Sequence, residues 1–340
     1  MSETGFPGAA NPLGIPPGTA PRPTTTFGQV LDRVLRLMRS HLRLFVSIGL
    51  VPGAGIIAFY GIVIAAFFPV LKTLALHQAP AAGFSPASLA GLAVAYAAGV
   101  VLMVLLYALY EPAAVYAALE LNSGRPVTFG AAWAMAWSRA GRFIWLAILR
   151  ALIVMLPLVV FGGLILGSVG LSLAHGQGGM NPSLMMVVFP LFMLLYIAWM
   201  VYTVLIMLRL VLAMPACVAE DVSAWRAFRL SNQLTHGAKG RIFLLGLLIY
   251  AIAYAAFLVA EIVIFFLAAM VALVGMMLHL SLAPWGYIGI GAGVLVFAFA
   301  YLLWIAATAG AFSTLFAVVY QDQRARLDGV AARVDAANGL

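Results

Sequence analysis

Charged side chains are scarce in this chain, since Asp, Glu, Lys and Arg make up only 8% of its 340 residues. An average soluble domain has about 25%. Hydrophobic residues reach 65%, and the mean hydropathy is +1.10. Six apolar stretches approach or exceed the ~20 residues that a helix needs to cross a bilayer. An apolar soluble core accounts for one such stretch but not for six, so the sequence excludes a soluble globular domain.

Cysteine and catalytic motifs are also lacking. The single Cys217 excludes an internal disulfide and provides no metal-ligand spacing. It is interpreted either as a small apolar residue or as a site of reversible acylation at the membrane boundary. The sequence has no His-Glu-x-x-His, Gly-x-Ser-x-Gly or Gly-x-x-x-x-Gly-Lys motif. We therefore expect no cofactor, no metal and no enzymatic activity. The histidines are scattered through polar segments, at His41, His77, His175, His236 and His279.

The apolar stretches predict an all-α polytopic membrane protein with six transmembrane helices and short amphipathic surface helices. Residues 1–26, rich in proline and glycine, are expected to form a disordered tail. They contain no basic segment followed by an apolar run, so we expect no secretory signal. Residues 321–340 are expected to form a polar helical tail. The expected spans cover residues 44–71, 88–119, 143–173, 184–216, 242–277 and 285–320.

The formal charge of +8 reflects where the basic residues lie. In a soluble protein this surplus favours nucleic acid as a partner, but here the positive-inside rule explains it. Fifteen of the eighteen Lys and Arg residues fall in segments that share one face of a six-span chain. The opposite face holds only Lys72. We therefore expect both termini in the cytoplasm and no nucleic-acid partner.

Polar segments precede the first, third and fifth expected spans. Residues 27–42 alternate apolar and basic side chains with helical periodicity after Thr26, a plausible N-cap. This amphipathic helix lies either in the headgroup layer or on the protein's own cytoplasmic face. The three segments end at Arg43, Arg142 and Arg241, at intervals of 99 residues. The interval indicates either three repeats of a surface helix and two spans, or merely regular spacing of basic residues.

The third of these segments and the end of the sixth span carry two short motifs. The first reads E…A-x-x-x-S-x-x-L-T-x-G-x-x-x-R and consists of Glu220, Ala227, Ser231, Leu234, Thr235, Gly237 and Arg241. The second reads Y-x-D-x-R-x-R-x-D-G and consists of Tyr320, Asp322, Arg324, Arg326, Asp328 and Gly329. Together with a leading helix from Phe27 to Leu44, they resemble the membrane domain associated with glycerophosphoryl diester phosphodiesterases and related bacterial six-span proteins.

The resemblance covers residues 27–330 and departs from the family pattern at two positions. Asp328 stands where the family has Glu, and Gln321 where a second aromatic residue is common. We expect no catalytic barrel of the kind that some relatives carry in a chain of this length, so phosphodiesterase activity is not transferred. The resemblance implies an integral, multi-pass module of the bacterial cytoplasmic membrane whose biochemical role is undefined.

Four ionisable residues fall inside the expected spans: Glu111, Arg150, Arg209 and Glu261. Charge at bilayer depth is costly, so such residues face the bundle interior, pair, or extend toward the headgroups. Glu111 and the two arginines lie at similar depths, which makes an ion pair of Glu111 with Arg150 or with Arg209 geometrically possible. The alternative to a structural ion pair is an anion or lipid-headgroup site in which arginine contacts phosphate. Glu261 is a candidate proton or cation carrier.

Two main functional hypotheses follow, and a third, an intramembrane enzyme, requires a polar cavity that gathers several of these residues. The first is a non-catalytic membrane module that organises anionic lipid, a membrane-protein partner or a second copy of itself at the cytoplasmic leaflet. The second is a transporter of a small solute or lipid, because glycine- and proline-interrupted helices often line transport sites. The charged cluster of the C-terminal segment is interpreted either as a solvated helix face or as a partner for Arg229 or Arg241. This cluster consists of Asp322, Arg324, Arg326 and Asp328.

Overall fold

The computed structural model describes residues 26–75, 86–174, 182–277 and 282–337. The regular structure within these ranges is helical, which confirms the expected all-α class. The expected tail 1–26 falls outside the described residues, apart from Thr26. In chain order the helices are α1 (Phe27–Ser40), α2 (Leu42–Ala75), α3 (Pro86–Asn122), α4 (Phe129–Ser138), α5 (Ala140–Ala174), α6 (Pro182–Leu210), α7 (Ala213–Glu220), α8 (Ala224–Thr235), α9 (Lys239–Met277) and α10 (Leu282–Ala337).

Within the described ranges, six helical stretches are long and apolar enough to cross a membrane, by length and composition. They overlap all six expected spans, so the chain is a multi-span helical membrane protein. The side on which the termini lie stays a prediction. The candidate spans cover Leu42–Val63, Ala93–Asn122, Ala140–Pro157, Phe189–Glu220, Lys239–Leu267 and Val296–Gly329.

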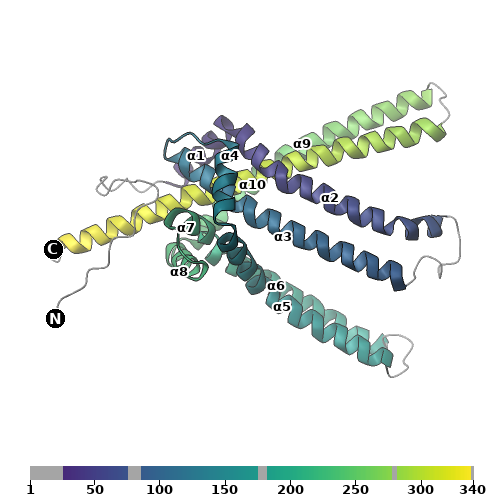
Figure 1. Cartoon of the computed structure of the whole chain (residues 1–340), viewed down its shortest axis with the longest axis horizontal. Coiled ribbons are helices and arrows are strands. Elements are labelled where there is room, and N and C mark those ends of the chain that lie inside the picture. The colour runs from purple at the N-terminus through teal and green to yellow at the C-terminus, as the bar shows by residue number, and fades with distance from the viewer. Residues whose placement is uncertain (1–25, 76–85, 175–181, 278–281, 338–340) are drawn as a thin grey trace.

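The long helices form three hairpins, α2–α3, α5–α6 and α9–α10, that spread apart from a common end (Figure 1). The short helices α1, α4, α7 and α8 gather at that end. Helix α10 packs against both α9 and α2, and α3 packs against α5, so the hairpins meet near their bases. A short helix precedes each hairpin, as the three-unit layout requires, although repetition itself stays a prediction.

The buried core lies at the common end of the hairpins. Val34 of α1, Leu119 of α3 and Leu315 of α10 are at most 1% exposed. Val30 and Met38 of α1 are buried as well, so this helix covers the protein's own face with its apolar stripe. Large apolar side chains further along the hairpins are exposed in the structure, as on α6 and α9. A bilayer provides the apolar surroundings that such surface requires.

Tryptophan side chains join the two helices of a hairpin in the same way in α5–α6 and α9–α10. The Trp199 indole donates to the Val154 carbonyl at 3.0 Å. The Trp304 indole donates to the Ala253 carbonyl at 2.9 Å. Both bonds link a second span to the backbone of the preceding span, which fixes the register of each hairpin.

The expected fourth span, 184–216, is interrupted in the structure. Helix α6 ends at Leu210, and α7 begins at Ala213. Pro215 lies in the first turn of α7, where a helix tolerates proline, whereas in a continuous helix its ring would clash with the carbonyl of the residue four positions earlier. Helix α7 then runs as a separate short helix, and its residues from Ala213 to Ala219 are all buried.

Ser231 of α8 forms hydrogen bonds with backbone groups on both sides of this break. Its hydroxyl donates to the Arg209 carbonyl at 2.7 Å and accepts from the Leu212 amide at 3.2 Å. The Arg209 carbonyl lies in the last turn of α6 and the Leu212 amide directly precedes α7, two places where helical partners are missing. Ser231 is fully buried, so one side chain fixes α8 against the end of α6.

Candidate functional site

Two predicted intramembrane residues meet between α3 and α5. Arg150 Nη1 donates to Glu111 Oε1 at 2.7 Å, and Nη2 contacts Oε2, so the pair is bidentate. The Arg150 and Glu111 side chains are 25% and 21% exposed. Glu111 therefore pairs with Arg150 and not with Arg209, and the pair carries no net charge.

A cavity of about 570 Å³ adjoins the Glu111–Arg150 pair. It lies between α3, α5, α6, α9 and α10, where the three hairpins approach one another. Apolar side chains form most of its wall, among them Met207, Leu247 and Phe312. The cavity is large enough for a small organic ligand, because such sites measure about 300–1,000 Å³.

Five residues that carry a hydroxyl group line the same cavity: Tyr107, Tyr110, Thr203, Tyr250 and Ser313. Tyr110 Oη and Thr203 Oγ1 are buried without a partner in hydrogen-bonding geometry among the described residues. The Ser313 hydroxyl lies close to Tyr110 but donates to the Ala309 carbonyl at 3.0 Å. A buried polar group without a hydrogen-bond partner lowers the stability of the fold by about 1–3 kcal/mol. A ligand that bonds to these hydroxyls would recover part of this free energy.

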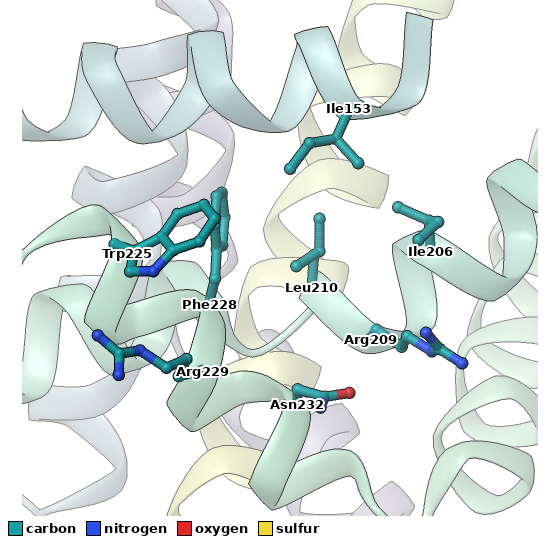
Figure 2. Close-up of a pocket in the computed structure, with 8 residues that line it drawn as sticks. All are labelled: Ile153, Ile206, Arg209, Leu210, Trp225, Phe228, Arg229 and Asn232. Atoms are coloured by element: carbon teal, nitrogen blue, oxygen red, sulfur yellow. The ribbon is translucent and has the colours of Figure 1, made fainter. Parts of the chain in front are cut away.

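A second pocket of about 260 Å³ lies between α5, α6 and α8 (Figure 2). Arg209 comes from the last turn of α6, and Arg229 and Asn232 come from α8. In Figure 2 the two guanidinium groups point away from each other, and the amide of Asn232 lies between the arginines. The pocket is lined by Ile153, Ile206, Arg209, Leu210, Trp225, Phe228, Arg229 and Asn232.

The arginines of the second pocket differ from Arg150 in having no acidic partner in the part of the chain that the structure describes. No carboxylate within the described ranges lies within 4.0 Å of Arg209 or Arg229. Both side chains are exposed, and Trp225 beside them is 61% exposed. Arginine and tryptophan together are typical of a membrane interface, where the indole ring lies at headgroup level. The pocket thus presents uncompensated positive charge beside an interfacial aromatic ring.

The common end of the hairpins also contains an ion-pair network. Arg139 Nη1 lies 2.8 Å from Asp221 Oδ1, and Arg142 contacts the same oxygen. Asp221 ends α7 in the left-handed conformation with φ of 53°. Arg125, in the turn after α3, pairs with Glu120, and this hydrogen bond raises the pKa of the Arg125 guanidinium. In these pairs the acidic and basic side chains of neighbouring segments partly neutralise one another.

The residues of the family-like motifs meet in this network. Tyr320 Oη donates to Glu220 Oε1 at 2.7 Å, and Arg324 Nε lies 3.5 Å from the same oxygen. Arg241 Nη1 lies 3.4 Å from Asp322 Oδ2. The C-terminal charged cluster therefore pairs with Arg241, not with Arg229.

Arg326 Nε also contacts Asp322 Oδ2, at 3.1 Å. Leu234 and Thr235 are buried at the end of α8, and Gly237 follows with φ of 76°. This positive φ favours glycine and ends the helix. These contacts give the motif residues structural roles in this chain.

The remaining predicted residues lie outside both pockets. Arg43 is exposed near the start of α2, and Glu261 is half-buried on α9 with no ion-pair partner among the described residues. Cys217 is buried in α7, where its thiol contacts the Val222 carbonyl at 3.4 Å. This burial favours the interpretation of Cys217 as a small apolar residue. The described ranges contain no group of three His, Cys, Asp or Glu side chains placed to hold a metal.

The sequence did not identify several residues that line the two pockets, namely Tyr110, Thr203, Trp225, Asn232 and Ser313. Each is an ordinary residue type in its segment, and only the packing of distant helices brings it to a cavity. For Trp225 one signal was present, since an exposed tryptophan beside arginines is typical of an interfacial helix.

No protein-family model, no curated protein sequence and no solved structure matches the chain. The resemblance to the membrane domain associated with glycerophosphoryl diester phosphodiesterases therefore stays a prediction.

Proposed function

We propose that this protein is a non-catalytic membrane module that binds anionic lipid at one membrane interface, through Arg209 and Arg229. The observation that carries the proposal is that both arginines line one pocket and neither has an acidic partner among the described residues. Eight other arginines in the described ranges are paired with Asp or Glu side chains. An anion is the ligand that complements this pocket.

The surroundings of the two arginines favour a lipid phosphate. Each guanidinium can donate two parallel hydrogen bonds to a phosphate, and Asn232 adds an amide donor between the arginines (Figure 2). Because the two guanidinium groups point away from each other, contact of both with one phosphate requires these long, exposed side chains to turn toward it. Ile153 and Ile206 supply apolar contacts on the side of the spans, where an acyl chain leaves the headgroup. The concentration of basic residues on one face supports the cytoplasmic leaflet as the location, and the family resemblance supports a bacterial inner membrane.

The proposal is tested with the full chain in nanodiscs of phosphatidylcholine that contain increasing amounts of phosphatidylglycerol. Native mass spectrometry counts the phosphatidylglycerol molecules that remain bound. In the double variant Arg209→Gln/Arg229→Gln we expect binding to weaken by at least about tenfold, because two charge-assisted contacts are lost.

The matched control is Arg33→Gln/Arg226→Gln, which removes the same charge. Arg226 lies on α8 near Arg229 but does not line the pocket, and Arg33 lies on α1. Both are exposed and have no acidic partner among the described residues. Equal losses in the two double variants would show a diffuse basic surface and contradict the proposed pocket.

Transport of a small solute or lipid is the alternative function. Its support is the cavity that reaches Glu111 and Arg150 within candidate spans. The test is scrambling of fluorescent phosphatidylglycerol in liposomes, read by dithionite quenching. A rate equal to that of protein-free liposomes contradicts lipid transport, whereas a faster rate that the cavity-filling variant Gly246→Leu abolishes supports it.

A further inference from the structure

We propose that the cavity between α3, α5, α6, α9 and α10 is a second ligand site, which binds an uncharged amphiphile with an aliphatic chain and a hydroxyl head. Diacylglycerol and long-chain alcohols belong to this class. The inference does not depend on lipid binding by Arg209 and Arg229, because the two pockets share only Leu210.

The ion pair determines the charge of the ligand. Both terminal nitrogens of Arg150 bond to Glu111, so its bidentate donor face is already occupied. A phosphate or carboxylate that approaches Arg150 also approaches the Glu111 carboxylate and is repelled. A cation meets the opposite sign from Arg150. The neutral pair therefore favours a neutral ligand head at this depth.

The hydroxyl groups determine the chemistry of the head. The Tyr110 side chain is only 4% exposed, yet its hydroxyl lines the cavity without a hydrogen bond of acceptable geometry to any described residue, as does that of Thr203. Each hydroxyl both donates and accepts, so together they match the hydroxyl of an alcohol or a glycerol. A pure hydrocarbon leaves both hydroxyls without partners.

The remaining wall determines the body of the ligand. Val204, Met207, Leu247, Phe312 and Phe316 surround the cavity with apolar surface. An aliphatic chain matches this apolar surface and packs against it through dispersion contacts. The ligand thus places its head beside Tyr110 and its chain among residues of α6, α9 and α10.

Gly246 offers a way to fill the cavity. It lies on α9 in the cavity wall, and a Cβ at this position would lie 3.7 Å from Phe312 Cε1, an ordinary contact. Gly246→Leu therefore inserts methyl groups into the space of the ligand. The matched control is Gly61→Leu, since Gly61 is an exposed helical glycine of another span with open space around it.

The experiment measures binding of dioleoylglycerol and of dioleoylphosphatidic acid to the full chain in detergent by native mass spectrometry. The two lipids share their acyl chains and differ in the phosphate. In Arg209→Gln/Arg229→Gln, where the anionic pocket is weakened, we expect dioleoylglycerol to bind at least about fivefold more tightly than dioleoylphosphatidic acid. Gly246→Leu should weaken dioleoylglycerol binding about tenfold or more, and Gly61→Leu should not.

Two outcomes overturn the proposal: stronger binding of the phosphatidic acid in that background, or unchanged dioleoylglycerol binding in Gly246→Leu. A second variant decides the matter if Gly246→Leu does not fold. Tyr110→Phe/Thr203→Val keeps the shape of the wall and removes both hydroxyls, and it should weaken dioleoylglycerol binding about fivefold. An unchanged affinity in this variant also overturns the proposal, because it shows that the head does not bond there.

Discussion

Arg150 and Arg209 are the same residue type at similar predicted depth, yet their surroundings differ. Arg150 is three-quarters buried and bonded on both terminal nitrogens by Glu111. Arg209 is exposed at the end of α6, and neither it nor Arg229 in the same pocket has an acidic partner among the described residues. The first charge is neutralised by the fold, whereas the second is left for the surroundings to neutralise. Pairing, not depth, separates a structural arginine from a candidate binding residue.

Removal of Glu111 should have the largest effect, because it leaves the Arg150 charge without a partner. Loss of one member of a fully buried pair costs about 3–5 kcal/mol, and partial exposure here reduces the expected cost to about 2–3 kcal/mol. Glu111→Leu should therefore lower the free energy of unfolding by this amount, measured by denaturant titration in detergent.

The double variant Glu111→Leu/Arg150→Leu removes both charges and should recover most of the stability that Glu111→Leu loses. Glu261→Leu is the control, since Glu261 has no ion-pair partner in the described ranges. If Glu111→Leu is no less stable than this control, Arg150 does not differ from Arg209 in the way that the structure indicates.

Ser231→Ala should affect both the stability of the fold and lipid binding at the Arg209 pocket. The variant leaves the Leu212 amide and the Arg209 carbonyl without their side-chain partner, which should lower the free energy of unfolding by about 1–2 kcal/mol. The Arg209 pocket should also widen, because α8 loses its anchor. Phosphatidylglycerol binding and stability should fall together, and a loss of stability with full lipid binding would contradict the role of Ser231 in placing the pocket.

A rise in salt concentration should weaken lipid binding at Arg209 more than it weakens the Glu111–Arg150 pair, and we expect this effect to be smaller than the preceding ones. The exposed pocket of Arg209 and Arg229 is screened by counterions, so a rise from about 0.05 to 0.5 M NaCl should weaken phosphatidylglycerol binding severalfold. The partly buried Glu111–Arg150 pair is screened less, and the free energy of unfolding should change little. Lipid binding that does not respond to salt would show that the headgroup is held by apolar contacts alone.

Arg209→Gln should have the smallest effect on the fold. The guanidinium makes no ion pair among the described residues, so the free energy of unfolding should stay within about 0.5 kcal/mol of the parent. Arg150→Gln is the comparison, because it leaves Glu111 uncompensated. Similar losses in the two variants would remove the distinction between the arginines.

The features that the sequence predicted depend on local composition. The length of an apolar run is a local property, so all six spans were found. The similar depths of Glu111 and Arg150 followed from counting residues along helices. The break before Ala213 was missed, although Pro215 was visible, because a proline alone does not distinguish a kink from two helices. The two pockets depend on how α8 and the hairpins pack, which no single segment encodes.

The continuity of α10 has a mechanical consequence. The helix runs for 56 residues from the far end of its hairpin to the C-terminal side of the common end (Figure 1). At 1.5 Å per residue it is about 84 Å long. It carries Ser313 at the cavity and Tyr320 at the ion-pair network on one stiff rod. A ligand that tilts α10 at the cavity therefore moves its C-terminal end as a lever moves, and a small rotation in the membrane becomes a larger displacement outside it.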